Sequence, residues 1–123
     1  MNTISKSLLL AATFLLSIST FGQKKMDANE MAEYQNNLMK SELNLNSEQL
    51  AKVEELNAKY SVKTADLMNK EGSMFGKIGD MKKIKKAKNE ELAKILTEEQ
   101  MEKFEDELEP KIRKTMRKKM SEK

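Results

Sequence analysis

Two nearly identical phrases constrain the fold of this chain more than any other feature of its sequence. The letters LNSEQ occupy residues 45–49, and LTEEQ occupy residues 96–100. Each phrase places a good N-cap residue, Asn46 or Thr97, three positions before a glutamine. This spacing is typical of a capping box, in which each of the two side chains accepts a hydrogen bond from the other residue's backbone amide. The phrases therefore predict two helices that begin in the same way, with Gln49 and Gln100 completing the boxes.

A leucine precedes each cap, and an apolar residue occupies the fourth helical position. Leu45 is thus placed to pack against Leu50, and Leu96 against Met101, as in a hydrophobic staple. Taken alone, either phrase indicates only the start of a helix. A pair so alike in a chain of this size asks for a further explanation.

The composition fits one small helical domain. The chain has 123 residues, of which 35% are charged and only 5% aromatic, with one proline and four glycines. These values favour an all-α fold over a sheet protein. Small chains bury a low fraction of their surface, so self-association would help stability. The net charge is only +3, which gives no argument for nucleic acid as a partner.

The first 22 residues are predicted to be a cleaved secretory signal. Residues 1–6 carry one positive charge and no acid, residues 8–18 form an apolar run, and small residues follow. Residues 23–123 are then expected to form the single mature domain, exported and without stable membrane insertion. A retained membrane anchor is the alternative, but the apolar run is short for a bilayer span. The absence of cysteine excludes both a lipoprotein anchor and disulfides.

The spacing of apolar residues predicts four helices, over about 27–42, 47–69 and 80–95 and from 98 onward. All four apolar stripes are narrow, which favours a thin, elongated bundle built around a long helical hairpin. Between the second and third stretches, the segment KEGSMFGKIGD has three glycines within eight residues, which predicts the hinge of the hairpin. Pro110 interrupts the last stretch.

With two L-[TN]-x-x-Q phrases, each opening a charged amphipathic helix after an export signal, the chain resembles the LTXXQ-motif (Spy/CpxP-like) family of bacterial envelope proteins. The resemblance covers roughly residues 31–108 in layout, and it departs from the family where Asn46 replaces the usual threonine and where Pro110 lies in the last helix. It implies a cradle-like periplasmic homodimer that binds unfolded or aggregation-prone envelope proteins without ATP. Some members of the family instead serve as accessory sensors of envelope stress or bind metal, and this regulatory function is the alternative.

The residue types present argue against an enzyme. Without histidine or cysteine, the chain cannot build the usual zinc site or a histidine-based nucleophilic triad. Residues 72–78 look somewhat like a phosphate-binding loop, but the glycines are one residue too close and Ile78 replaces the required serine or threonine. We therefore expect no catalytic residue, no cofactor and no metal ligand among the usual donors.

Methionine is unusually frequent. The chain has ten methionines, against about two per cent expected in an average protein. Flexible, polarizable side chains of this kind suit a surface that fits many apolar partners. Thioethers also bind Cu(I), but no tight Met-x-Met cluster appears, so we do not predict a copper site.

The predicted contact with client proteins lies in the hinge and just after it. Exposed apolar side chains normally reduce solubility, so apolar residues beside positive charge suggest a use. The candidate client-binding residues are Met74, Phe75, Ile78, Met81, Lys82, Lys83, Lys85 and Lys86. Two other interpretations stay open: Phe75 folds back to plug the end of the bundle, or the lysines serve only solubility.

A second basic cluster spans residues 111–119 near the end of the chain. It has the charge to lie on anionic lipid, but its apolar face consists only of Ile112, Met116 and Met120. This face is thin for a membrane-surface helix, so binding of protein clients remains the leading interpretation.

The export signal gives the first testable prediction. Cleavage after Gly22 places the small residues Thr20 and Gly22 at the two positions that signal peptidase favours. We expect mass spectrometry of the exported protein to find a mature chain that begins at Gln23. An exported chain that still carries Met1 would contradict this prediction.

Overall fold

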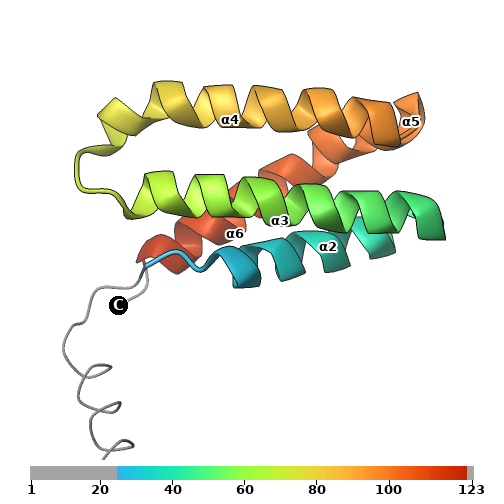
Figure 1. Cartoon of the computed structure of the whole chain (residues 1–123), viewed down its shortest axis with the longest axis horizontal. Helices are drawn as coiled ribbons and strands as arrows, with labels where there is room; N and C mark the ends of the chain where they lie inside the picture. The colour runs from blue at the N-terminus through green and yellow to red at the C-terminus, as the bar shows by residue number, and fades with distance from the viewer. Residues whose placement is uncertain (1–24, 122–123) are drawn as a thin grey trace, which may run out of the picture.

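The computed structural model describes residues 25–121, and the predicted signal lies outside this range. The described part is a bundle of helices without a strand, as predicted. Its elements are α2 (Ala28–Leu43), α3 (Ser47–Asn69), α4 (Met74–Ile95), α5 (Glu98–Lys103), the π-helical turn η1 (Phe104–Leu108) and α6 (Glu109–Ser121). In Figure 1, α3 and α4 form a long hairpin, α2 lies along α3, and the last helix crosses behind α3.

The first reversal of the chain is set by capping residues. Asp27 begins α2 by accepting hydrogen bonds from the backbone amides of Asn29 at 2.9 Å and Glu30 at 3.2 Å. Asn44 ends the helix in the left-handed conformation, with φ of 52°. Asparagine tolerates this conformation better than most residues, which lets the chain reverse within three residues before α3 begins.

The second reversal is tighter than the sequence predicted. The expected third helix begins at Asp80, but α4 begins at Met74, so the turn comprises only residues 70–73. Gly72 has φ of +123°, and Ser73 caps α4 by accepting a hydrogen bond from the amide of Gly76 at 3.3 Å. Gly76 and Gly79 lie inside the helix. A helical glycine costs only about 1 kcal/mol, so a good N-cap and tertiary contacts are enough to extend α4 across both.

Lys77 provides one of those contacts. Its side chain is buried, and its Nζ donates hydrogen bonds to the carbonyls of Met68, at 3.1 Å, and Lys70. These carbonyls belong to the end of α3, where the helix dipole favours a cation. Lys77 therefore caps the end of α3 from the first turns of α4 and fixes the hairpin.

Pro110 does not break the last helix. Directly before it, η1 widens the helix by one residue, and the amide of Glu109 donates to the carbonyl of Phe104 five positions earlier. A proline has no amide proton and its ring collides with the carbonyl four residues before it, so a widened turn at this place accommodates it. As a result α5, η1 and α6 run on as one helix (Figure 1).

All the major helices contribute to one apolar core. Its buried members are Met39, Leu43, Val53, Leu56, Tyr60, Leu92, Leu96, Phe104, Leu108 and Ile112. Polar groups border this core as well. Asn57 is fully buried, and its side-chain amide donates to Oδ1 of Asn36 on α2 at 2.8 Å.

Two polar side chains near the core have strongly shifted pKa values. Lys88 on α4 donates to Oε1 of Gln35, and its Nζ lies 5.9 Å from the centre of the Phe104 ring. Burial lowers the pKa of Lys88 to about 8, against an opposing effect of Glu109. The hydroxyl of Tyr60 donates to Glu91, and this hydrogen bond, together with burial, raises the pKa of Tyr60 to about 12.

These shifts predict how stability depends on pH. Between pH 8 and 10.5 the unfolded chain holds a proton that folded Lys88 has lost, so the free energy of unfolding rises with pH. Above pH 10 the unfolded chain loses the Tyr60 proton that the folded chain keeps, so the free energy falls. We expect urea unfolding to show a maximum of stability near pH 10, in the overlap of these windows. Lys88→Met should flatten the rise of the free energy of unfolding above pH 8, whereas the exposed control Lys82→Met should not. Equal pH slopes in the two variants would contradict the assignment of this rise to Lys88.

Candidate functional site

The candidate apolar residues lie on the first two turns of α4 and are exposed to solvent. The exposed fraction is 57% for Met74, 88% for Phe75 and 44% for Ile78. We call these three residues the apolar tip. At 88% exposure Phe75 does not plug the end of the bundle, so that interpretation is wrong. An aromatic side chain left this open can instead contact another molecule.

The path of the last helix explains why the apolar tip is uncovered. In Figure 1, α6 crosses behind α3 and ends beside the start of α2, away from the first turns of α4. The hydroxyls of Tyr34 and Thr115, 3.1 Å apart, and an ion pair between Lys119 and Glu30 hold it there. Because α6 packs on α2 at this end of the bundle, it does not cover the tip.

The lysines predicted to attract clients follow the tip on the same helix. Lys82, Lys83, Lys85 and Lys86 are all exposed, while Met81 between them and the tip is half-buried. Nζ of Lys85 lies 3.6 Å from a carboxylate oxygen of Glu109, which ties it to α6. Within residues 25–121 the other three have no ion-pair partner. Their charge is therefore available to a partner in solution.

Both predicted capping boxes are present. The amide of Gln49 donates to Oδ1 of Asn46 at 2.8 Å, and Oε1 of Gln49 accepts from the amide of Asn46 at 3.1 Å. The second box has the same bonds, at 3.1 Å to Oγ1 of Thr97 and 3.0 Å to Oε1 of Gln100. Leu96 is buried and Leu45, Leu50 and Met101 are half-buried, which agrees with apolar contacts beside each cap.

The two boxes are also joined to each other, which the sequence did not predict. Nε2 of Gln49 donates to Oε1 of Gln100 at 2.7 Å, and the reverse bond measures 3.4 Å. Gln49 donates further to the carbonyl of Ile95 at 3.2 Å, and Gln100 to that of Leu43 at 3.0 Å. Leu43 and Ile95 are the last residues of α2 and α4. Each glutamine thus caps its own helix and bonds to the end of the helix that precedes the other box.

This arrangement, which we call the glutamine pair, explains the repeated phrase. The two phrases meet at one end of the bundle and tie together two helix starts and two helix ends. No local signal reveals such a bond, because the two glutamines are 51 residues apart in the sequence. The side chains of the two N-cap residues and the two glutamines are therefore already used in holding the helices together, and the tip remains the better candidate for contact with a client.

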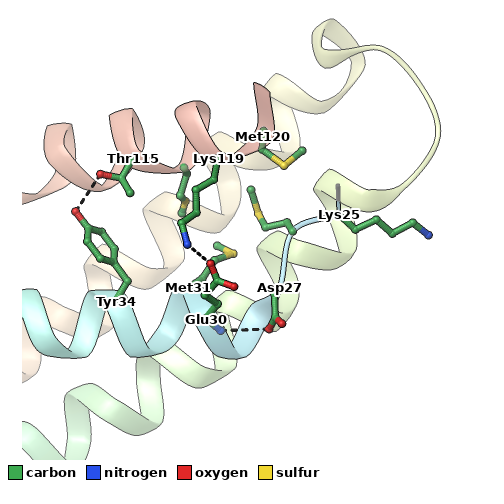
Figure 2. A pocket seen from close by; sticks show the side chains of 10 residues that line it. Lys25, Asp27, Glu30, Met31, Tyr34, Thr115, Lys119 and Met120 are labelled. Carbon is green, nitrogen blue, oxygen red and sulfur yellow. Dashed lines mark hydrogen bonds and ion pairs between the residues drawn. The ribbon is translucent and has the colours of Figure 1, made fainter. Parts of the chain in front are cut away.

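Sequence reasoning also missed a small pocket of about 50 Å³ between the start of α2 and the end of α6. Four methionines are among the residues that line it: Met26, Met31, Met116 and Met120 (Figure 2). The spacing of Met116 and Met120 places them on one face of a helix, but nothing local indicates that this face meets α2.

Between residues 25 and 121 there is no helix that is long and apolar enough to cross a bilayer. In the same range no three His, Cys, Asp or Glu residues are grouped so that they could hold a metal ion.

Comparison with known protein families gives a match over most of the chain. Residues 19–104 match a family described as "Domain of unknown function (DUF4890)". The matched region contains both repeated phrases, the apolar tip and the lysines after it. No curated protein and no solved structure matches the chain.

The glutamine pair predicts a measurable coupling. We expect Gln49→Ala and Gln100→Ala each to lower the free energy of unfolding by about 1–2 kcal/mol, since each leaves part-buried polar groups unpaired. The double variant should cost less than the sum by about 1 kcal/mol, because the first change already breaks the shared bonds. Loss of a single cap, in Asn46→Ala or Thr97→Ala, should cost about 1 kcal/mol.

Urea unfolding of the four chains of this cycle measures the coupling. A matched control is the pair Glu48→Ala and Glu99→Ala, which changes the exposed residue beside each glutamine. The changes in the free energy of unfolding caused by these two control substitutions should add. Strict additivity for the glutamines as well would show that the pair contributes no shared stability.

Proposed function

The chain belongs to the DUF4890 family, and we propose that it is an ATP-independent holding chaperone for unfolded or aggregation-prone proteins of the bacterial envelope. One observation carries the proposal. Three large apolar side chains are exposed on the first turns of α4, and solvated lysines follow them on the same helix. Since exposed apolar groups favour aggregation, their retention on a small, highly charged protein supports a use in binding.

The chemistry of this surface suits clients of varied sequence. Unfolded chains expose apolar side chains, and the apolar tip offers an aromatic ring and a flexible thioether that adapt to different shapes. The lysines add a long-range attraction that raises the rate of encounter without fixing one geometry. Such contacts are weak and reversible, which suits holding a client rather than binding it permanently.

The glutamine pair supports a finer assignment, to the LTXXQ-motif (Spy/CpxP-like) proteins. The two phrases begin the helices α3 and α5. Within each phrase the N-cap residue and the glutamine form a capping box, and the two glutamines also bond to each other. On this basis we propose that the mature chain works in the periplasm, after removal of residues 1–22, as a homodimer. The small size of the core supports association, since a chain this short buries little apolar surface alone.

The alternative is a regulatory protein that docks on a single membrane sensor or metal-resistance complex. The same apolar tip and lysines would then form the docking surface. The number of clients distinguishes the two functions, because a chaperone acts on several unrelated unfolding proteins whereas a regulator binds one folded partner tightly.

An aggregation assay tests the proposal. Light scattering of several unrelated, thermally unfolding proteins should fall when the exported chain is added without nucleotide. Phe75→Ser combined with Ile78→Ser should remove most of this suppression, because it removes the apolar contact. The free energy of unfolding should change by less than about 0.5 kcal/mol, since both side chains are exposed. Val62→Ser is the matched control, because Val62 is 49% exposed but lies on α3.

Charge reversal tests the contribution of the lysines. Replacing Lys82, Lys83 and Lys86 by glutamate should slow capture of an acidic client and reduce the dependence of the capture rate on salt.

Full suppression of aggregation by the Phe75 and Ile78 variant would exclude the apolar tip as the client contact. A shift of that variant from dimer to monomer would assign the tip to self-association instead, and activity toward one partner alone would favour the regulator.

A further inference from the structure

The methionine-lined pocket is independent of the surface proposed for clients. It lies between the start of α2 and the end of α6, whereas the apolar tip belongs to α4. The hydrogen bond between Tyr34 and Thr115 and the ion pair between Glu30 and Lys119 join the two helices beside it (Figure 2). Its walls are thus held together by contacts that do not use the methionines.

The thioethers are the soft donors of this pocket, and its oxygen donors already take part in hydrogen bonds or an ion pair. Asp27 accepts hydrogen bonds from two amides at the start of α2. Glu30 pairs with Lys119, and the two hydroxyls bond to each other. Hard divalent cations prefer a site with several carboxylate or carbonyl oxygens, and Asp27 and Glu30 are the two carboxylates in this lining, so it does not suit them.

The geometry brings soft ligands from both ends of the domain to one place. Met26 and Met31 come from the first residues described, and Met116 and Met120 from the last helix. In Figure 2, Met31 extends from α2 and Met120 from α6 toward the space between the helices. Each side chain has three rotatable bonds, so the sulfurs can adjust around a small ion.

The formal charge of the lining residues favours a monovalent cation as the ligand. Lys25 and Lys119 are balanced by Asp27 and Glu30, which leaves a formal charge of zero on the residues around the pocket. An apolar cavity of this kind carries a large desolvation cost for a divalent cation and a smaller one for a monovalent cation.

We propose that the methionine pocket binds a soft monovalent cation of the Cu(I) or Ag(I) type through thioether sulfurs of Met26, Met31, Met116 and Met120. Soft thioether ligands select Cu(I) over the common divalent ions. Neighbouring methionines in the sequence are not required, because the fold supplies the cluster from two distant segments. A bound ion would also link α2 to α6 and stabilise the folded chain by mass action.

Titration of the chain beginning at Gln23 with Ag(I), in a chloride-free buffer, tests the site without redox chemistry. Since the protein has neither cysteine nor histidine, thiolate and imidazole binding cannot contribute. We expect one ion per chain and an upward shift of the thermal midpoint. Met31→Leu combined with Met120→Leu should weaken binding by about tenfold or more while leaving the apo chain folded, because leucine nearly conserves the volume of methionine.

Met74→Leu is the matched control, because Met74 lies on the apolar tip, and it should bind Ag(I) as the unchanged chain does. The affinities for Cu(I), supplied anaerobically with a competing chelator, should rank the variants in the same order as the affinities for Ag(I). Equal binding by the double variant and the unchanged chain would overturn the proposal. So would an equal loss in Met74→Leu, or displacement of Ag(I) by an equimolar amount of Zn(II).

Discussion

The hydrogen bonds between Gln49 and Gln100 are the contact on which the arrangement of the helices depends. A helix end leaves backbone groups without partners, and a small bundle must satisfy several of them near its core. Here two side chains do so for two helix starts and two helix ends at once. The pair therefore fixes the end of the α2–α3 hairpin against the α4–α5 corner. From this joint α5 and α6 return across the bundle to the start of α2.

Two lysines also donate hydrogen bonds to backbone carbonyls at helix ends. Nζ of Lys103 donates to the carbonyl of Glu42 at 2.9 Å near the end of α2, as Lys77 does at the end of α3. A cation at a helix C-terminus gains from both the hydrogen bond and the helix dipole. Part of the positive charge of the chain is thus structural. Lys82, Lys83 and Lys86 are different, because they lie on the exposed face of a helix interior and bond to no carbonyl in the described part of the chain.

Local signals predicted what depends on local physics. The capping boxes and the bounds of α3 follow from side chains within a few residues of each other, and both agree with the structure. The start of α4 was misplaced by six residues because the glycines of the segment outweighed Ser73, although serine is itself a favoured N-cap residue. The glutamine pair, the buried position of Lys77 and the methionine pocket could not be predicted, since each joins segments whose contact depends on the packing of whole helices.

The π-helical turn also accounts for the spacing of apolar residues in the last helix. Phe104, Leu108, Ile112, Met116 and Met120 recur every four residues. An α-helix has 3.6 residues per turn, so a four-residue repeat drifts by about 40° at each step and about 160° over the whole series. The additional residue of η1 absorbs about 100° of that rotation. The apolar residues therefore stay on the buried side of the helix as it passes from the core to the pocket. A deletion of one residue within 104–108 would rotate Met116 and Met120 away from α2.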